Sequence, residues 1–376
     1  MTYDLAIVGA GILGLAHALA ATRRGLKTVV IDREAQAIGA SVRNFGFITV
    51  TGQQAGACWQ RAMRSRDVWA EVAPKAGIPV EHHGTLIPAQ RPEAMAVLEA
   101  FARTDMGAEC RLLTPATLKA RHGAILTNRD WQGALWSPHE LRVESRHAIP
   151  RLAAWLEAQG TNFRRQTLVT DVEPGHITTT TGAIQAETIV VCPGDDLLTL
   201  FPDRIAALGI SRCRLNMMKI TPGAGFKLPG AIMSDLSLIR YLGWSELPEA
   251  AALKARLQRE QPDHLAQGIH LIAVQGADSG LIVGDSHHFE PSPSPFQSGQ
   301  VDTLIRHELH QVLNLPAAHT TEHWMGTYAT LPDQLMVRDA PAPTIRLVII
   351  TSGTGASTSF AIAEETLTDL YGKPTP

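Results

Sequence analysis

The chain has 376 residues, of which 45% are hydrophobic and 18% charged, so it can bury a sizeable core and is not intrinsically disordered. Its 33 Lys and Arg residues against 36 Asp and Glu residues give a net charge of −3, and no run of basic residues occurs, so we expect no nucleic-acid partner. The length exceeds that of one ordinary core and predicts two domains.

The four cysteines, Cys58, Cys110, Cys192 and Cys213, are far apart and form no CxxC pair. This spacing excludes a zinc knuckle and fits a reducing cytoplasm, where we expect the protein to reside. No basic region precedes the first apolar segment, so we expect no signal peptide. The apolar segment 5–21 is short for a membrane span and contains His17 and three glycines, so we expect no membrane partner.

The N-terminal segment "YDLAIVGAGILGLAHALAATRRGLKTVVIDRE" predicts a strand, a tight turn, a helix and a second strand. We expect the helix to run from about Ile12 to Arg24 and to stop at Gly25. The strands "DLAIVG" and "KTVVID" are nearly continuous apolar runs, which is typical of a parallel sheet covered on both faces.

Three glycines and an acid in this segment indicate dinucleotide binding. Gly9 permits the tight turn, Gly11 lets a pyrophosphate approach the backbone, and Gly14 lets the helix pack close to the strand. Asp32 ends the second strand 18 residues after Gly14, where a carboxylate can accept a ribose hydroxyl. The alternative, a glycine-rich turn in an ordinary strand–helix–strand unit, leaves Gly11 and Asp32 together unexplained.

Later segments supply further polar turns. "GASVRNFGFITVTGQ" offers Ser41, Arg43 and Asn44 as donors to a phosphate or a flavin edge, the alternative being a plain polar loop. "RRQTLVTDVE" and "ITTTTGAIQAETIVVCPGDDL" predict short strands that end in a turn at Gly194. The terminal "IRLVIITSGTGASTSFAIAEETLTDLYG" predicts a strand, a turn and a helix whose N-terminus can hold electron-rich oxygen atoms.

The middle of the chain predicts a second sheet with helices. "HGTLIPA" and "QGIHLIAVQGADSGLIVGDSHHF" have the pattern of strands and hairpins, and "RPEAMAVLEAFARTDMG" and "SGQVDTLIRHELHQVLN" that of amphipathic helices. "EPSPSPFQSG" predicts an exposed loop.

Histidine-containing segments do not predict a metal site. "RHELH" lacks the paired histidines at i and i+4 that zinc binding on one helix face requires. His319 and His323 have that spacing, but no further ligand is evident, so we expect no metal site. Neither a G-x-S-x-G elbow nor a Walker A run occurs, so no motif supports a hydrolase or an NTPase.

The segments "VGAGILG" with Asp32, "GASVRNFG", "VVCPGD", "HWMGTYATLPD" and "SGTGAS" occur in one order along nearly the whole chain. In these segments the chain resembles the FAD-dependent amine and amino-acid oxidase family, which includes glycine oxidase, sarcosine oxidase and D-amino-acid oxidase. Through "GASVRNFGF", "SPHELRVESR" and "LIVGDSHHF" it is similar to a bacterial subgroup associated with phosphonate breakdown.

The resemblance implies a mixed α/β and α+β architecture. A Rossmann-like FAD-binding domain would comprise residues 1–80, 145–210 and 325–376, interleaved with an antiparallel-sheet substrate domain of residues 81–144 and 211–324.

The resemblance also implies FAD rather than NAD. Val169 would meet the adenine through its backbone, and Arg43 and Asn44 would lie along the isoalloxazine. Some relatives attach FAD through a Cys near the C-terminal turn or a His after the second strand, but "SGTGASTSF" and "SVRNFGF" contain neither, so we expect non-covalent FAD. The expected cofactor-binding residues are Gly9, Ala10, Gly11, Ile12, Leu13, Gly14, Asp32, Arg33, Ser41, Val42, Arg43, Asn44, Phe45, Val169, Gly194, Gly353, Thr354, Gly355, Ala356, Ser357 and Thr358.

The implied activity is oxidation of a small primary or secondary amine through an imine to a carbonyl compound, with O2 as the expected acceptor and Arg43, Asn44 and Tyr328 as candidate catalytic residues. Two alternatives stay open: a flavin enzyme that oxidises an amino acid or a hydroxy acid, and a non-catalytic flavin-binding subunit of a complex.

In amino-acid oxidases of this family, the segment equivalent to "HWMGTYATLPD" carries an Arg two residues after the glycine, which pairs with the substrate carboxylate. Here Tyr328 takes that place after Gly326, which predicts poor activity on glycine, sarcosine and D-amino acids. The phosphonate-linked resemblance implies 2-aminoethylphosphonate or its N-methyl derivative, converted to phosphonoacetaldehyde. Candidate substrate-binding residues are Arg142, Arg146, His287 and Tyr328; alternatively, Tyr328 packs over the flavin and Arg214 binds a carboxylate.

Overall fold

The first sheet contains the predicted strand–turn–helix–strand unit. The computed structural model describes residues 2–373, and in it the strands of this sheet run in the order β17-β18-β10-β1-β2-β7, with β9 pairing β10 and β8 pairing β9. The pairs β1–β2, β1–β10, β10–β18 and β2–β7 are parallel, as the apolar strands predicted. The strands are β1 (Thr2–Val8), β2 (Thr28–Ile31), β7 (Asn162–Arg164), β8 (Val169–Glu173), β9 (His176–Thr179), β10 (Gly182–Val191), β17 (Met336–Ala342) and β18 (Ile345–Ile350).

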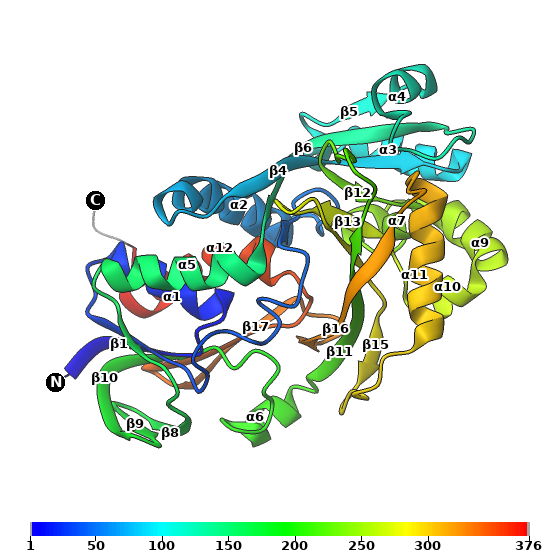
Figure 1. Ribbon diagram of the computed structural model, residues 1–376. Helices are drawn as coiled ribbons and strands as arrows, with labels where there is room; N and C mark the ends of the chain where they lie inside the picture. Colours follow the sequence, from blue (N-terminus) through cyan, green and yellow to red (C-terminus); the bar gives the residue numbers. More distant parts are fainter. Residues whose placement is uncertain (1, 374–376) are drawn as a thin grey trace.

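Four helices belong to this part of the molecule: α1 (Ile12–Thr22), α2 (Ala57–Lys75), α5 (Ser145–Ala158) and α12 (Gly355–Tyr371). Figure 1 shows α1, α5 and α12 together above the sheet, and both ends of the described chain lie in this half of the molecule. Helix α1 ends two residues before the predicted Arg24, and Gly25, at φ +70°, takes the left-handed conformation that stops it. The predicted helix is therefore confirmed with a shorter C-terminus.

The second sheet has the strand order β15-β11-β14-β13-β12-β4-β6-β3, with β16 pairing β11 and β5 pairing β6. The expectation of an antiparallel sheet needs one correction, because β4 and β12 pair in parallel. The chain leaves this sheet after β6 and returns to it at β11, and β12 then pairs with β4 on the side opposite to β6. The strands are β3 (Phe47–Ile48), β4 (Val80–Ala89), β5 (Arg111–Leu113), β6 (Gly133–Val143), β11 (Ser211–Thr221), β12 (Ala231–Met233), β13 (Ile272–Gln275), β14 (Leu281–Gly284), β15 (His288–Glu290) and β16 (His319–Thr330).

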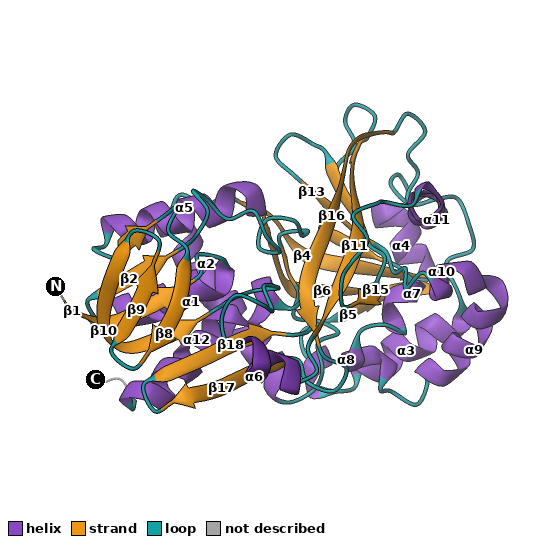
Figure 2. Ribbon diagram, turned by 90° about the horizontal axis from the view of Figure 1, so that it is seen from below, coloured by secondary structure: helices purple, strands orange, loops and turns teal. Residues whose placement is uncertain are grey.

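The remaining helices lie mostly on the side of the second sheet that faces away from the first (Figure 2). Both amphipathic helices predicted for the middle of the chain are present, as α3 and α11. The helices are α3 (Pro92–Ala102), the 3-10 turn η1 (Asp105–Gly107), α4 (Pro115–His122), α6 (Pro202–Ala207), α7 (Asp235–Leu238), α8 (Leu242–Ser245), α9 (Ala250–Glu260), α10 (Pro262–Ala266) and α11 (Gly299–Val312). Within residues 2–373, no helix combines the length and apolarity that a membrane span requires.

The chain passes between the sheets several times. Strand β3 lies in the N-terminal segment yet pairs with β6 of the second sheet, and the expected boundary at residue 325 falls inside β16. We propose that 1–80, 145–210 and 325–376 form the cofactor domain and 81–144 and 211–324 the substrate domain; residues 1 and 374–376 lie outside the described part.

Candidate active site

A cavity of about 380 Å³ lies between the two sheets. The turns that follow β1, β10 and β18 line it, and these strands are parallel, so their carboxyl ends meet at one edge of the first sheet. Ligands of open parallel sheets bind at that edge. The other wall is formed by β11, β16 and the hairpin of β13 and β14.

The three glycines of the N-terminal turn are needed for different reasons. Gly9 has φ +104°, and a Cβ there would collide with the carbonyl oxygen of Cys192. A Cβ on Gly14 would collide with the carbonyl oxygen of Gly9, so Gly14 permits the helix to start close to the strand. Gly11 has an ordinary φ of −71°, and a Cβ there would lie 2.9 Å from Ser41 Oγ on the wall of the cavity.

Asp32 and Ser41 stabilise this turn by accepting hydrogen bonds from backbone N–H groups. Asp32 Oδ2 accepts a hydrogen bond from the Ala10 N–H over 2.6 Å, and Oδ1 accepts one from the Glu34 N–H over 2.8 Å. Ser41 Oγ accepts the Ile12 N–H, one of the free amides at the start of α1, over 2.9 Å. Asp32 therefore organises the turn, and its contact with the ribose stays a prediction.

Arg43 and Asn44 both line the cavity but differ in their partners. The Arg43 side chain is exposed and takes part in no ion pair or side-chain hydrogen bond among residues 2–373. Asn44 donates to the Ala40 carbonyl over 2.7 Å and accepts from the Gly46 N–H and Ser145 Oγ over 2.7 and 2.8 Å. Arg43 is thus free to act on a ligand, whereas the polar atoms of Asn44 hold the loop together.

The C-terminal turn faces Tyr328. Gly353 has φ +70°, and a Cβ there would lie 3.1 Å from Tyr328 Cζ, so the tyrosine ring packs directly on the turn. Ser357 Oγ accepts a hydrogen bond from the Thr49 N–H over 2.8 Å, which ties the start of α12 to the segment after β3. Burial raises the pKa of Tyr328 well above its ordinary value, so this side chain stays a neutral phenol.

Most of the expected cofactor residues line the cavity, and seven do not. Arg33 forms an ion pair of 2.8 Å with Asp196, and Val169 is buried in the hairpin of β8 and β9. The expected residues that line the cavity are Gly11, Ile12, Leu13, Gly14, Ser41, Arg43, Asn44, Phe45, Gly194, Gly353, Thr354, Gly355, Ala356 and Ser357; those that do not are Gly9, Ala10, Asp32, Arg33, Val42, Val169 and Thr358.

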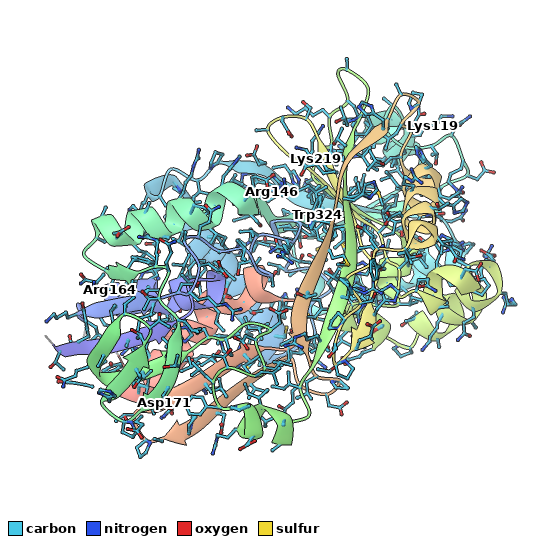
Figure 3. The ribbon with its side chains drawn as sticks, turned by 60° about the horizontal axis from the view of Figure 1, so that its bottom comes forward. Lys119, Arg146, Arg164, Asp171, Lys219 and Trp324 are labelled. Carbon is cyan, nitrogen blue, oxygen red and sulfur yellow. The ribbon has the colours of Figure 1, made fainter. Side chains whose placement is uncertain are left out.

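The fold places two of the four expected substrate-binding residues at the cavity and the other two outside it. His287 and Tyr328 line the cavity, but Arg142 and Arg146 do not. Arg142, on β6, is buried and pairs with Glu144 over 2.7 Å. Arg146 pairs with Glu322 over 2.7 Å, and its guanidinium lies 4.9 Å from the Trp324 ring centre (Figure 3).

Arg214, the alternative carboxylate ligand, does not reach the cavity either. Its Nη1 donates to the Phe296 carbonyl over 3.2 Å, and its Nη2 lies 3.7 Å from Glu290 Oε1. The alternative therefore loses its proposed arginine, while its other half, Tyr328 packed over the flavin, stays a prediction.

The polar cavity residues that sequence reasoning missed include Arg240, Tyr241, His270 and Asp285. Arg240 lies in the turn between α7 and α8 and forms no ion pair within the described chain. No motif marks it. His270 and Asp285, in contrast, flank the hairpin that the sequence predicted, so the pairing of its ends could have indicated that they are neighbours.

The fold and the cavity define a dinucleotide-dependent oxidoreductase, with a glycine turn at the end of β1, an acid at the end of β2 and a second sheet over the cavity. The family model described as FAD dependent oxidoreductase matches residues 4–369, and the chain belongs to this family. FAD is accordingly the cofactor of this enzyme.

Solved structures share the fold at low sequence identity. Glycine oxidase from Geobacillus kaustophilus is 16% identical with a TM-score of 0.78, covering 100% of this chain and 96% of that one. L-Proline dehydrogenase from P. horikoshii is 16% identical with a TM-score of 0.79 and coverage of 100% and 94%. L-α-Glycerophosphate oxidase from Mycoplasma pneumoniae, with FAD bound, is 16% identical with a TM-score of 0.73 and coverage of 100% and 97%. No curated protein matches the sequence significantly.

The residues present fit FAD. At Gly11 the backbone is open to the cavity only because no Cβ is present, which is what an approaching pyrophosphate requires. The starts of α1 and α12 both line the same cavity and present free backbone N–H groups to oxygen atoms.

Proposed function

We propose that the enzyme oxidises a small anionic amine, 2-aminoethylphosphonate or its N-methyl derivative, to phosphonoacetaldehyde. FAD supplies the two-electron acceptor when it is bound. The amine loses a hydride equivalent from its α carbon and a proton from nitrogen, and water converts the resulting imine to the aldehyde and ammonia or methylamine. O2 takes up the two electrons and two protons as hydrogen peroxide.

The observation that carries this proposal is Arg240. Arg240 lines the cavity on the side of the second sheet and forms no ion pair in the described chain, although Asp195 and Asp285 line the same cavity. An arginine in a ligand cavity that no ion pair occupies favours an anionic substrate. Arg43, which also forms no ion pair in the described chain, lines the same cavity and offers an anionic group a second cation.

Tyr328 supports a phosphonate over a carboxylate. It lies on β16, where the resemblance places the carboxylate-binding arginine, and its neutral phenol offers one hydroxyl and no charge. A phosphonate has three oxygens and needs several separate donors, which Arg240, Tyr241 and Tyr328 around one cavity can provide.

We also propose that FAD is held without a covalent bond. Cys192 lines the cavity, but burial raises the pKa of its thiol far above the ordinary value, so it does not form the thiolate that an attachment needs. Heat or acid should release free FAD from the protein, and flavin that stays attached after denaturation would contradict this part. The four unpaired thiols support the proposal of a reducing, cytoplasmic location.

The test is a comparison of kcat/KM for 2-aminoethylphosphonate, its N-methyl derivative, glycine, sarcosine and a 2-hydroxy acid, with loss of flavin absorbance measured without oxygen. We expect the two phosphonates to be preferred at least tenfold. Preference for the amino acids would refute the phosphonate substrate, and preference for a 2-hydroxy acid would refute the amine class. Flavin that no substrate reduces would favour the non-catalytic subunit.

A further inference from the structure

Two histidines and an aspartate meet at the end of the hairpin formed by β13 and β14. His270, Asp285 and His287 each offer one ligand atom, and these three atoms lie within 4.8 Å of one another. His270 Nε2 is 3.0 Å from Asp285 Oδ1, and His287 Nε2 is 3.9 Å from Asp285 Oδ2. All three side chains line the cavity although they are more than nine-tenths buried.

The backbone holds this group in place. The Asp285 N–H donates to the His270 carbonyl over 3.0 Å, and the His270 N–H donates to the Asp285 carbonyl over 3.3 Å, which extends the ladder of β13 and β14. The His287 N–H donates to the Gln267 carbonyl over 3.1 Å. Side chains carried by a paired hairpin hold their relative positions better than side chains on a free loop.

Contacts at Nδ1 of His270 and His287 leave Nε2 of each ring facing the Asp285 carboxylate. His287 Nδ1 lies 2.9 Å from the Gly268 carbonyl, so Nδ1 carries the proton and Nε2 keeps its lone pair. His270 Nδ1 lies 3.4 Å from Ser237 Oγ, which in turn donates to the Leu271 carbonyl over 3.0 Å. In metal sites, a hydrogen bond from the ring nitrogen that does not bind the metal orients the histidine in the same way.

One buried oxygen lacks the hydrogen bond that its burial demands. Asp285 Oδ1 has no hydrogen-bond partner of acceptable geometry, although it is close to His270 Nε2. An unsatisfied carboxylate oxygen at 4% exposure is costly unless a ligand completes it.

We propose that His270, Asp285 and His287 bind a divalent first-row transition-metal ion at the wall of the cavity. Two histidines and one carboxylate form a facial ligand set that suits Zn²⁺, Mn²⁺ or Fe²⁺ and leaves positions open toward the cavity. Ligand atoms about 2.1 Å from one ion lie roughly 3 to 3.5 Å from each other, so the three ligand atoms, now within 4.8 Å of one another, have to draw closer when the ion binds.

Arg240 faces the same group and opposes a bound cation. Arg240 and the three residues of the site line the same cavity. Removal of this charge in Arg240→Gln should therefore tighten metal binding several-fold. A purely structural role for the three residues predicts no such change.

The experiment is a calorimetric titration of the FAD-loaded, chelator-treated protein with Zn²⁺, Mn²⁺ and Mg²⁺, combined with metal analysis after gel filtration. We expect one Zn²⁺ or Mn²⁺ per chain and no binding of Mg²⁺, which prefers oxygen ligands. Asp285→Asn and His287→Ala should each weaken Zn²⁺ binding at least a hundredfold. Retained flavin absorbance and circular dichroism establish that the variants are folded.

Two controls separate this site from surface histidines. His288→Ala changes the adjacent histidine, which does not line the cavity, and the double variant His319→Ala/His323→Ala removes the exposed pair. Both controls should keep the stoichiometry and affinity of the wild type. No binding by the wild type, binding that survives Asp285→Asn, or weaker binding in folded Arg240→Gln overturns the proposal.

Discussion

The backbone N–H of Ile12 donates a hydrogen bond of 2.9 Å to Oγ of Ser41, and a Cβ on Gly11 would lie 2.9 Å from the same oxygen. Ser41 thus satisfies a free amide at the start of α1 and lies against the position that a Cβ on Gly11 would take. The glycine turn and the segment after β2 therefore form one wall of the cofactor cavity.

Gly11→Ala should fold but lose most of its FAD affinity, because its φ of −71° suits any residue while the new methyl group enters the cavity wall. Gly14→Ala should instead fail to fold, because its Cβ would strike the Gly9 carbonyl. Gly39→Ala is the matched control, since nothing lies within 4 Å of its Cβ. Flavin content and circular dichroism of the three variants test this, and wild-type FAD affinity in Gly11→Ala would disprove it.

Arg43→Ala and Asn44→Ala should have opposite effects. Arg43 has no partner in the described chain, so its loss should leave the unfolding temperature within 1–2 °C and lower kcat about a hundredfold, the scale seen for groups that stabilise developing charge. Asn44 makes three hydrogen bonds, so Asn44→Ala should lower the free energy of unfolding by about 2–3 kcal/mol. Thermal melts and steady-state kinetics measure both effects; full turnover in Arg43→Ala would remove its assigned role.

Arg240→Ala should raise KM for the phosphonate roughly 10- to 100-fold, since a charge-assisted pair contributes about 1.5–3 kcal/mol. Arg240→Lys should recover part of this loss. Arg146→Ala is the matched control: Arg146 lies outside the cavity against Glu322 and Trp324, and its loss should change KM less than twofold. A large effect of Arg146→Ala with none for Arg240→Ala would reverse the assignment.

His17 should make folding sensitive to acid. Burial in α1 lowers the pKa of His17 to about 4, against an ordinary value of 6.5, so the unfolded chain binds the extra proton first as the pH falls. The stability that depends on neutral His17 is present above pH 6.5 and is lost as the pH falls toward 4. Between pH 7.5 and pH 5 the loss is about 2 kcal/mol.

His17→Leu should remove this dependence. The free energy of unfolding of the wild type should therefore fall by about 2 kcal/mol relative to that of the variant from pH 7.5 to pH 5. Urea denaturation at the two pH values measures it. Other buried histidines cancel in this comparison because both proteins contain them. An unchanged difference would show that His17 is not neutral in the folded chain.

Local patterns predicted the parts of the molecule in which neighbours along the chain decide the structure. The glycine turn, Asp32, the strands of the parallel sheet, helices α3 and α11 and the hairpin of β13 and β14 follow from periodicity and turn residues over short segments. The family and FAD follow from the same segments because a phosphate-binding turn is itself a local structure.

The substrate side of the cavity depends on contacts between distant segments, and there the sequence was insufficient. Arg142 and Arg146 lie in a segment that carries the resemblance, yet β6 and the start of α5 direct them to Glu144 and Glu322. Arg240 carries no motif and becomes a cavity residue only because the turn between α7 and α8 reaches the cavity wall.

The proposed metal site likewise depends on tertiary structure and not on local sequence. The sequence offers many histidines, and no spacing along the chain selects His270, Asp285 and His287. The hairpin brings His270 beside Asp285 by backbone pairing, and burial then leaves one carboxylate oxygen without a partner. The sequence by itself determined the cofactor turn and the class of enzyme, because those depend on local backbone geometry. Only the tertiary structure decided which charges face the cavity, because that depends on strand pairing and burial across the whole chain.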